Sequence, residues 1–281
     1  MKKKNYKVKK IIKELLKNGY YVINDVLDLK KCDLIIRNLE KLKKKTLKNK
    51  DFFDEATKKG QLIIRDLPLR DPKNFLNLID NKLIMEVLDG IFKETFILDN
   101  CMASKSINVK KKFNSLAHID SHIASKNVQD TLDIVACYCF DEFTQKNGAT
   151  KIWPKSHLSG IRLQNDKDYE KRIKSNFKYV EAKKGSVIIF LGQTWHQIGA
   201  NTNSLSRWGC LCHYKRWWIK PSTNWTKCGL KIFKLLNKKQ KELFGFTSIS
   251  PSFNFKKQTR KLKTLRKSLN LSMNYSKVLQ Y

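Results

Sequence analysis

Acidic residues are scarce in this chain of 281 residues: 25 Asp and Glu stand against 58 Lys and Arg, so the formal net charge is +33. An excess of this size is typical of proteins that bind nucleic acid or another anion. The lysines are scattered from end to end, with the densest runs at 41–50 and 256–267, as a biased base composition would also produce. The charge alone therefore leaves open a nucleic-acid partner, which we consider unlikely, and a small anionic substrate.

Long apolar runs are absent as well. A membrane-spanning helix needs about 20 consecutive apolar residues, and no such stretch occurs, so we predict no membrane span. The basic N-terminus has neither an uninterrupted apolar segment nor a small-residue cleavage site, which argues against a secretory signal. The odd number of cysteines, seven, includes Cys137/Cys139 and Cys210/Cys212. We interpret them as reduced core residues of a protein in a reducing, cytoplasmic compartment.

The chain contains enough apolar residues (41% in all, 11% aromatic) for a folded core. Apolar residues recur at helical spacing over 8–18, 29–48 and 73–91, with Gly19 and Gly90 as stops and a short strand at 20–23 between the first two. From about residue 95 the segments become short, β-branched and aromatic, and turn-like stretches separate them. The predicted strands are TFILDN, SINV, TLDIVACYCF, ATKIW, SVIIF and WGCLCHY.

With no linker in sight, we predict a single domain over 1–281. Its helical layer covers about 8–92, its antiparallel sandwich or barrel about 95–221, and a C-terminal helix and basic tail occupy 222–281.

Only five histidines occur, at 118, 122, 157, 196 and 213. His118 and Asp120 stand two residues apart, so on a strand end both side chains leave the same face. His196 follows the predicted strand SVIIF and a short turn, and could supply a third ligand. Two histidines and one carboxylate on one face of an octahedral metal form the facial triad of non-haem iron oxygenases, which leaves three coordination positions open.

An arginine, Arg207, follows His196 by eleven residues, in a stretch that alternates Trp208, Cys210, Cys212 and Tyr214 and that we predict to be a strand lining the barrel. A guanidinium pairs bidentately with a carboxylate, and a buried arginine needs an anionic partner. Arg207 is therefore the candidate to hold the far carboxylate of a 2-oxo acid; a salt bridge at the sheet edge is the alternative.

The segments HID, NGATKIWPKSHLSG, KKGSVIIFLGQTWHQIGANTNSLSR and CHYKRWWIKP, together with a later KELFGF, resemble the phytanoyl-CoA dioxygenase family over about residues 15 to 247. The resemblance implies a double-stranded β-helix (jelly roll) core with a helical layer. It also implies iron(II), with 2-oxoglutarate and dioxygen as cosubstrates. His118, Asp120 and His196 match the family's metal ligands, and Arg207 its 2-oxoglutarate arginine. Asn108 matches a position from which some members bring an amide to the cosubstrate.

The same resemblance implies hydroxylation of an unactivated C–H bond in a small metabolite, with release of succinate and carbon dioxide. Related halogenases lack the carboxylate that Asp120 supplies here, which favours hydroxylation, desaturation or ring closure over halogenation. The sequence departs from some relatives at Ile198, where they carry a serine that contacts 2-oxoglutarate; Thr202 is a candidate replacement. His122 is expected to be an ordinary strand-end residue, His157 to fix a loop, and Trp153 and Trp195 to belong to the barrel core.

Three alternatives stay open. The first is a nucleic-acid demethylase on the same fold, although such enzymes carry a second arginine six residues after the first, where this chain has His213. The second is a jelly-roll binding protein without catalysis, against which the intact His118, Asp120, His196 and Arg207 argue. The third is a zinc protein that uses the Cys-x-Cys pairs. The sequence does not indicate the oligomeric state.

Overall fold

The computed structural model describes residues 2–48, 60–108, 115–174, 176–203, 205 and 207–247, without the side chains of 2–6 and 45–48. The predicted tail after 247, with the basic run at 256–267, lies outside the described residues. None of the described helices is long and apolar enough to cross a membrane.

Six antiparallel strands form the large sheet, in the order β1-β7-β4-β9-β3-β2. Their bounds are β1 (Tyr20–Ile23), β7 (Val187–Leu191), β4 (Asp133–Cys139), β9 (Trp208–Arg216), β3 (Phe96–Ser106) and β2 (Gln61–Ile64). A smaller sheet has the order β6-β5-β8, formed by β6 (Lys178–Tyr179), β5 (Lys151–Ile152) and β8 (His196–Gln197). The two sheets confirm the expected all-antiparallel core.

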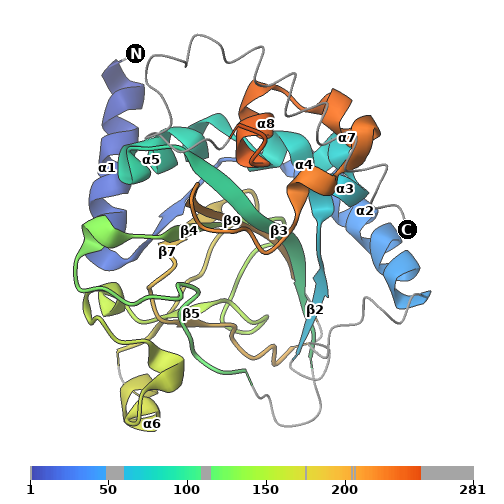
Figure 1. Cartoon of the computed structure of the whole chain (residues 1–281). Coiled ribbons are helices and arrows are strands. Elements are labelled where there is room, and N and C mark those ends of the chain that lie inside the picture. Colours follow the sequence, from blue (N-terminus) through green and yellow to red (C-terminus); the bar gives the residue numbers. More distant parts are fainter. Residues whose placement is uncertain are drawn as a thin grey trace, which may run out of the picture.

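Helices cover the outer face of the large sheet, and the small sheet lies on its other side with α6 (Tyr169–Ile173) (Figure 1). The covering helices are α1 (Lys2–Asn18), α2 (Leu29–Lys48), α3 (Leu67–Arg70), α4 (Pro72–Ile79), α5 (Lys82–Phe92), α7 (Gly229–Leu235) and α8 (Lys238–Leu243). The predicted helical layer is confirmed, and residues after Pro221 add to it. Helix α8 lies where the KELFGF resemblance places the closing helix.

The alternation of side chains along β9 divides the core in two. Trp208, Cys210, Cys212 and Tyr214 pack with the helices in one apolar cluster. Leu211 packs between the sheets with residues such as Val135 and Phe190 in another cluster. The prediction that this stretch lines the barrel is therefore wrong for the four alternating residues, which face the helical layer. The other face of β9, which carries Leu211 and His213, points between the sheets.

Two further expectations are corrected. The predicted helix at 73–91 is two helices, because the Asn81 side chain accepts hydrogen bonds from the main-chain N–H groups of Leu83 and Ile84 and so begins α5 anew. The predicted strand TFILDN lies in the first half of β3, which has an irregularity in its pairing with β9 between Leu98 and Asn100 and runs on to Ser106. Of the predicted strand SINV, only Ser106 belongs to β3, because Ile107 and Asn108 lie beyond its end and residue 109 is outside the described residues. Gly19 does end α1, in a left-handed conformation with φ of +85°.

Candidate metal centre and cosubstrate site

His118 and His196 lie side by side because their main chains pair directly. The N–H of each donates to the carbonyl of the other, at 2.9 Å and 3.0 Å. His196 begins β8 of the small sheet, just after the turn that follows β7. Their ring centroids are 4.4 Å apart. One local pairing thus joins two histidines that are far apart in the sequence.

Asp120 is held next to them by the same turn. Its N–H, and that of Ser121, donate to the carbonyl of Gly192, at 2.8 Å and 3.1 Å. The Ser121 hydroxyl also donates to the buried carboxyl group of Asp133 on β4. The segment that carries the first two predicted ligands is therefore anchored to the turn that carries the third.

The three side chains converge. The Nε2 atoms of His118 and His196 lie 3.6 Å and 3.5 Å from the Asp120 carboxylate oxygens, and one ligand atom from each residue lies within 4.8 Å of the others. Each histidine donates its Nδ1–H to a main-chain carbonyl, Leu116 at 3.0 Å and Thr194 at 2.9 Å. That tautomer leaves both Nε2 lone pairs directed toward Asp120, as a metal requires of imidazole ligands.

Burial and mutual charge set the protonation of this group. Burial, joined by the neighbouring histidines, lowers the pKa of His196 to about 4, although the Asp120 charge opposes that shift. Burial alone would raise the pKa of Asp120, but His196, His118 and His213 hold it well below its usual range. Near neutral pH the pair is thus a neutral imidazole and a carboxylate, the forms that bind a divalent cation.

The guanidinium of Arg207 is buried at the start of β9, with 3% of the residue exposed. Its Nη2 donates to the Gly148 carbonyl at 2.6 Å, and its Cζ lies 3.9 Å from the ring centroid of Phe143. Its Nε has no hydrogen-bond partner, and no carboxylate forms a salt bridge with it among the described residues. A buried cation in this condition fits an anionic ligand.

The structure places Asn108 beyond the end of β3, where it is exposed and donates its side-chain amide to the Asn203 carbonyl at 2.9 Å. No hydrogen bond joins it to Arg207 within the described parts of the chain. Thr202 donates its hydroxyl to the Lys146 carbonyl at 3.2 Å. Neither residue is brought to the guanidinium by these contacts, and the cosubstrate role of Asn108 stays a prediction.

The remaining sequence candidates are distributed around the site. His122 is exposed, whereas His157 is buried and its Nε2 donates to the Leu16 carbonyl at 2.9 Å, which fixes its loop to α1. Trp153 and Trp195 are buried with Ala117 and Ile119 in a small apolar cluster beneath the ligand segment. These two tryptophans thus belong to the core.

His213 is the site neighbour that the sequence reasoning missed. It had entered only as the residue that replaces a second arginine, yet its Nδ1 lies 3.8 Å from the Asp120 Oδ2. It lies on the inward face of β9, three side chains along that face from Arg207. The even spacing between Arg207 and His213 could have indicated that both residues share one face of the strand, since every second residue of a strand points to the same side.

Cysteine thiols form a second close group on the helical side of the sheet. The Sγ of Cys101 lies 3.6 Å from those of Cys210 and Cys212, all three fully buried. Cys101 pairs directly with Cys212 across β3 and β9, so the register itself explains the contact. Cys137 and Cys139 pack between the sheets instead. The zinc alternative, which was framed on Cys-x-Cys pairs, stays a prediction.

A sequence profile of the phytanoyl-CoA dioxygenase family matches residues 15–209 of this chain. An uncharacterised protein of Mycobacterium tuberculosis is 24% identical over 221 residues, which cover 74% of this chain and 76% of the relative. An uncharacterised protein of Saccharomyces cerevisiae is 22% identical over 263 residues, which cover 86% and 75% of the two chains.

Solved structures with the same fold include the epimerase SnoN in complex with Fe³⁺, alpha-ketoglutarate and nogalamycin RO. Its TM-score is 0.60 at 15% identity, over 78% of this chain and 88% of SnoN. HygX from Streptomyces hygroscopicus, with nickel and 2-oxoglutarate bound, has a TM-score of 0.60 at 13% identity, over 75% of this chain and 88% of HygX. These likenesses confirm the predicted jelly-roll core with its helical layer.

Proposed function

The chain belongs to the phytanoyl-CoA dioxygenase family of non-haem iron, 2-oxoglutarate-dependent oxygenases, and from that premise we propose that it hydroxylates an unactivated C–H bond of a small metabolite. His118, Asp120 and His196 hold the iron in this proposal, and Arg207 holds 2-oxoglutarate. The observation that carries it is the convergence of one carboxylate with two imidazoles whose rings are fixed by main-chain carbonyls, together with a buried guanidinium that has no carboxylate partner among the described residues.

The donor set fits iron(II) by its chemistry. Two imidazole nitrogens and one carboxylate are the ligands of the facial triad, and main-chain carbonyls already fix both rings. When bound, iron supplies the activation of dioxygen that couples decarboxylation of 2-oxoglutarate to oxidation of the substrate. The protein's own part is to hold the ligands, orient the cosubstrate and keep water out.

Arg207 is suited to the cosubstrate because it has hydrogen-bonding capacity left over. Its Nε–H finds no partner in the described parts of the chain, and the guanidinium is buried where an unpaired charge is costly. The distal carboxylate of 2-oxoglutarate would satisfy both the charge and the hydrogen bond. Ring contact with Phe143 fixes the plane of the guanidinium in advance, which lowers the ordering cost of binding.

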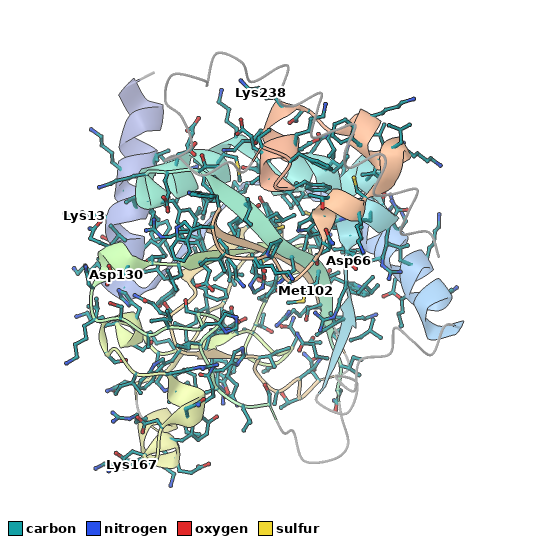
Figure 2. The ribbon with its side chains drawn as sticks, in the orientation of Figure 1. Lys13, Asp66, Met102, Asp130, Lys167 and Lys238 are labelled. Atoms are coloured by element: carbon teal, nitrogen blue, oxygen red, sulfur yellow. The ribbon has the colours of Figure 1, made fainter. Side chains whose placement is uncertain are left out.

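A small substrate is supported by the size of one described cleft. This cleft has a volume of about 270 Å³ and is lined in part by Asn100 and Met102 of β3, together with Arg65 and Asp66. Asn100 and Met102 pair with the inward-facing His213 and Leu211 of β9, so the cleft adjoins the inner face of the sheet. Figure 2 shows Asp66 and Met102 close to each other there. A lining that contains charged and polar side chains suits a polar metabolite.

The experiment is an anaerobic titration with iron(II) and 2-oxoglutarate that follows the weak visible charge-transfer band of the chelate. We expect the band in the wild-type chain and a marked loss of 2-oxoglutarate affinity in Arg207→Ala. Arg172→Ala is the matched control, because Arg172 lies on α6 and pairs with Asp166 and Asp168. A control with wild-type affinity would assign the effect to the buried guanidinium.

Absence of the band in the wild-type chain under every condition would overturn the proposal and favour a binding protein without catalysis. A band that is equally strong in Arg207→Ala would keep iron and 2-oxoglutarate but remove the role assigned to Arg207. Circular dichroism of each variant distinguishes loss of the ligand from loss of the fold.

A further inference from the structure

His213 is a buried histidine without the main-chain anchor that its buried counterparts have. His157 and His196 each donate a ring N–H to a carbonyl oxygen. His213 is 7% exposed, and its Nε2 is buried with no hydrogen-bond partner among the described residues. The polar contact that its ring does make is from Nδ1 to the Asp120 Oδ2, at 3.8 Å.

The Asp120 carboxylate has a matching deficit. Its Oδ2 is buried, lies 3.5 Å from the His196 Nε2 and 3.8 Å from the His213 Nδ1, and likewise lacks a hydrogen-bond partner in the described part of the chain. A carboxylate that binds a metal through one oxygen leaves the other to be satisfied, and a buried anionic oxygen without a donor is costly. The Nε2 atoms of His118 and His196 are not free for this task, because both would bind the metal.

We propose that His213 is a positioning residue of the metal centre: when the metal is bound, the 3.8 Å separation shortens to hydrogen-bond length, and the His213 Nδ1–H donates to the Asp120 oxygen that does not bind the metal. A carboxylate only accepts hydrogen bonds, so the ring nitrogen that faces it must carry the hydrogen. The donation fixes the rotation of the carboxylate and hence the direction of its metal-binding oxygen. This inference rests on the proposed metal centre and adds a residue to its supporting contacts.

Two substitutions separate this role from simple packing. His213→Phe keeps an aromatic ring of similar size but removes the donor. His213→Asn leaves a space in the core but keeps an N–H donor near the position of Nδ1. If His213 only fills space beside Val135, its cross-strand partner, Phe should be tolerated better than Asn. The proposed role predicts the opposite order in metal affinity.

The measurement is an absorbance titration of each metal-free variant with cobalt(II), whose visible bands report bound metal without any turnover. We expect His213→Phe to bind cobalt(II) about 10- to 100-fold more weakly than wild type, the usual effect of losing a residue that orients a metal ligand. His213→Asn should retain most of the affinity. His122→Ala is the matched control, since it removes an exposed histidine two residues from Asp120.

Equal cobalt(II) affinities in His213→Phe and wild type would overturn the inference and leave the metal centre itself intact. Weaker binding by His213→Asn than by His213→Phe would overturn it as well, in favour of packing. Failure of the wild-type chain to bind cobalt(II) or iron(II) is a different result, which would remove the proposed function together with its supporting residue.

Discussion

Among single residues, Asp133 has a protonation state that depends on the fold. Burial raises the pKa of its carboxyl group to about 7, with Asp120 and Asp99 adding to the shift against Ser121 and Lys215. An aspartate in the unfolded chain has a pKa near 3.9. Between these two values the folded protein holds a proton that the unfolded chain has released, so the free energy of unfolding of the metal-free protein falls as the pH rises.

Replacement of the Asp133 carboxyl group by an amide of the same shape should make the free energy of unfolding less dependent on pH. Between pH 4.5 and 7.5 the free energy of unfolding should fall less in Asp133→Asn than in wild type. We expect the two decreases to differ by on the order of 1 to 4 kcal/mol, since each pKa unit corresponds to about 1.4 kcal/mol. Urea unfolding of both metal-free proteins at the two pH values checks it. Parallel slopes for the two proteins would show that the Asp133 carboxyl group does not titrate in this range.

The residues that the sequence identified and those it missed differ in kind. His118, Asp120 and His196 could be named because a short motif, a strand and a family resemblance mark them before any geometry is known. His213 could not be named as a neighbour of Asp120, since the 3.8 Å contact depends on how two strands and a loop pack. The spacing along β9 places His213 on the same face as Arg207, but the contact with Asp120 itself is set by tertiary packing and has no local pattern in the sequence.

Between elements, the junction of α1 and β1 supports the turn that carries His196. The Gly19 carbonyl accepts hydrogen bonds from the Thr194 hydroxyl at 2.8 Å and from the Leu191 N–H at 2.9 Å. Gly19 has a φ of +85°, and a Cβ there would lie 2.6 Å from His157 Nδ1 and 2.7 Å from Thr194 Oγ1. The Thr194 carbonyl in turn holds the His196 ring.

Gly19→Ala should therefore both destabilise the protein and weaken its metal binding. Gly229 is the matched control, because it has a φ of +77° but no atom within 4 Å of an added Cβ. In Gly229→Ala we expect the free energy of unfolding to fall only by the cost of the left-handed conformation, about 1 to 3 kcal/mol. In Gly19→Ala it should fall by more. Urea unfolding and cobalt(II) titration measure the two effects. Equal losses in both variants would mean that the contact with Thr194 does not matter.

Elements were predictable where the local pattern was strong. The strand at 20–23 and the helix at 29–48 have the bounds that the apolar spacing indicates. The helix at 73–91 was wrong because apolar periodicity continues across Asp80 and Asn81, whereas the break depends on one side-chain cap at Asn81. The face of β9 was assigned wrongly because both faces are apolar, so alternation alone could not tell the helical side from the barrel interior.

At the scale of the molecule, the described part of the chain carries lysines on well-separated edges. Lys13, Lys167 and Lys238 lie at three separate edges in Figure 2. Several lysines and arginines pair locally with carboxylates, such as Lys184 with Asp33 and Arg216 with Glu94. A nucleic-acid enzyme needs its cations along a track toward the reacting centre, and His213 sits inside the barrel at 7% exposure where the demethylases carry an arginine.

We therefore expect oligonucleotides to bind this protein only through diffuse charge. Binding of a fluorescent single-stranded oligonucleotide should weaken steeply between 50 mM and 200 mM salt, by roughly 10³-fold or more if six or more phosphates are neutralised. The affinity should not depend on base methylation, and methylated oligonucleotides should not increase succinate formation from 2-oxoglutarate. The wild-type chain with no oligonucleotide gives the uncoupled background for that assay. Methyl-dependent stimulation of succinate formation at 150 mM salt would instead make nucleic acid the substrate and give the lysine surface a function, because charge-only binding cannot distinguish a methylated base from an unmodified one.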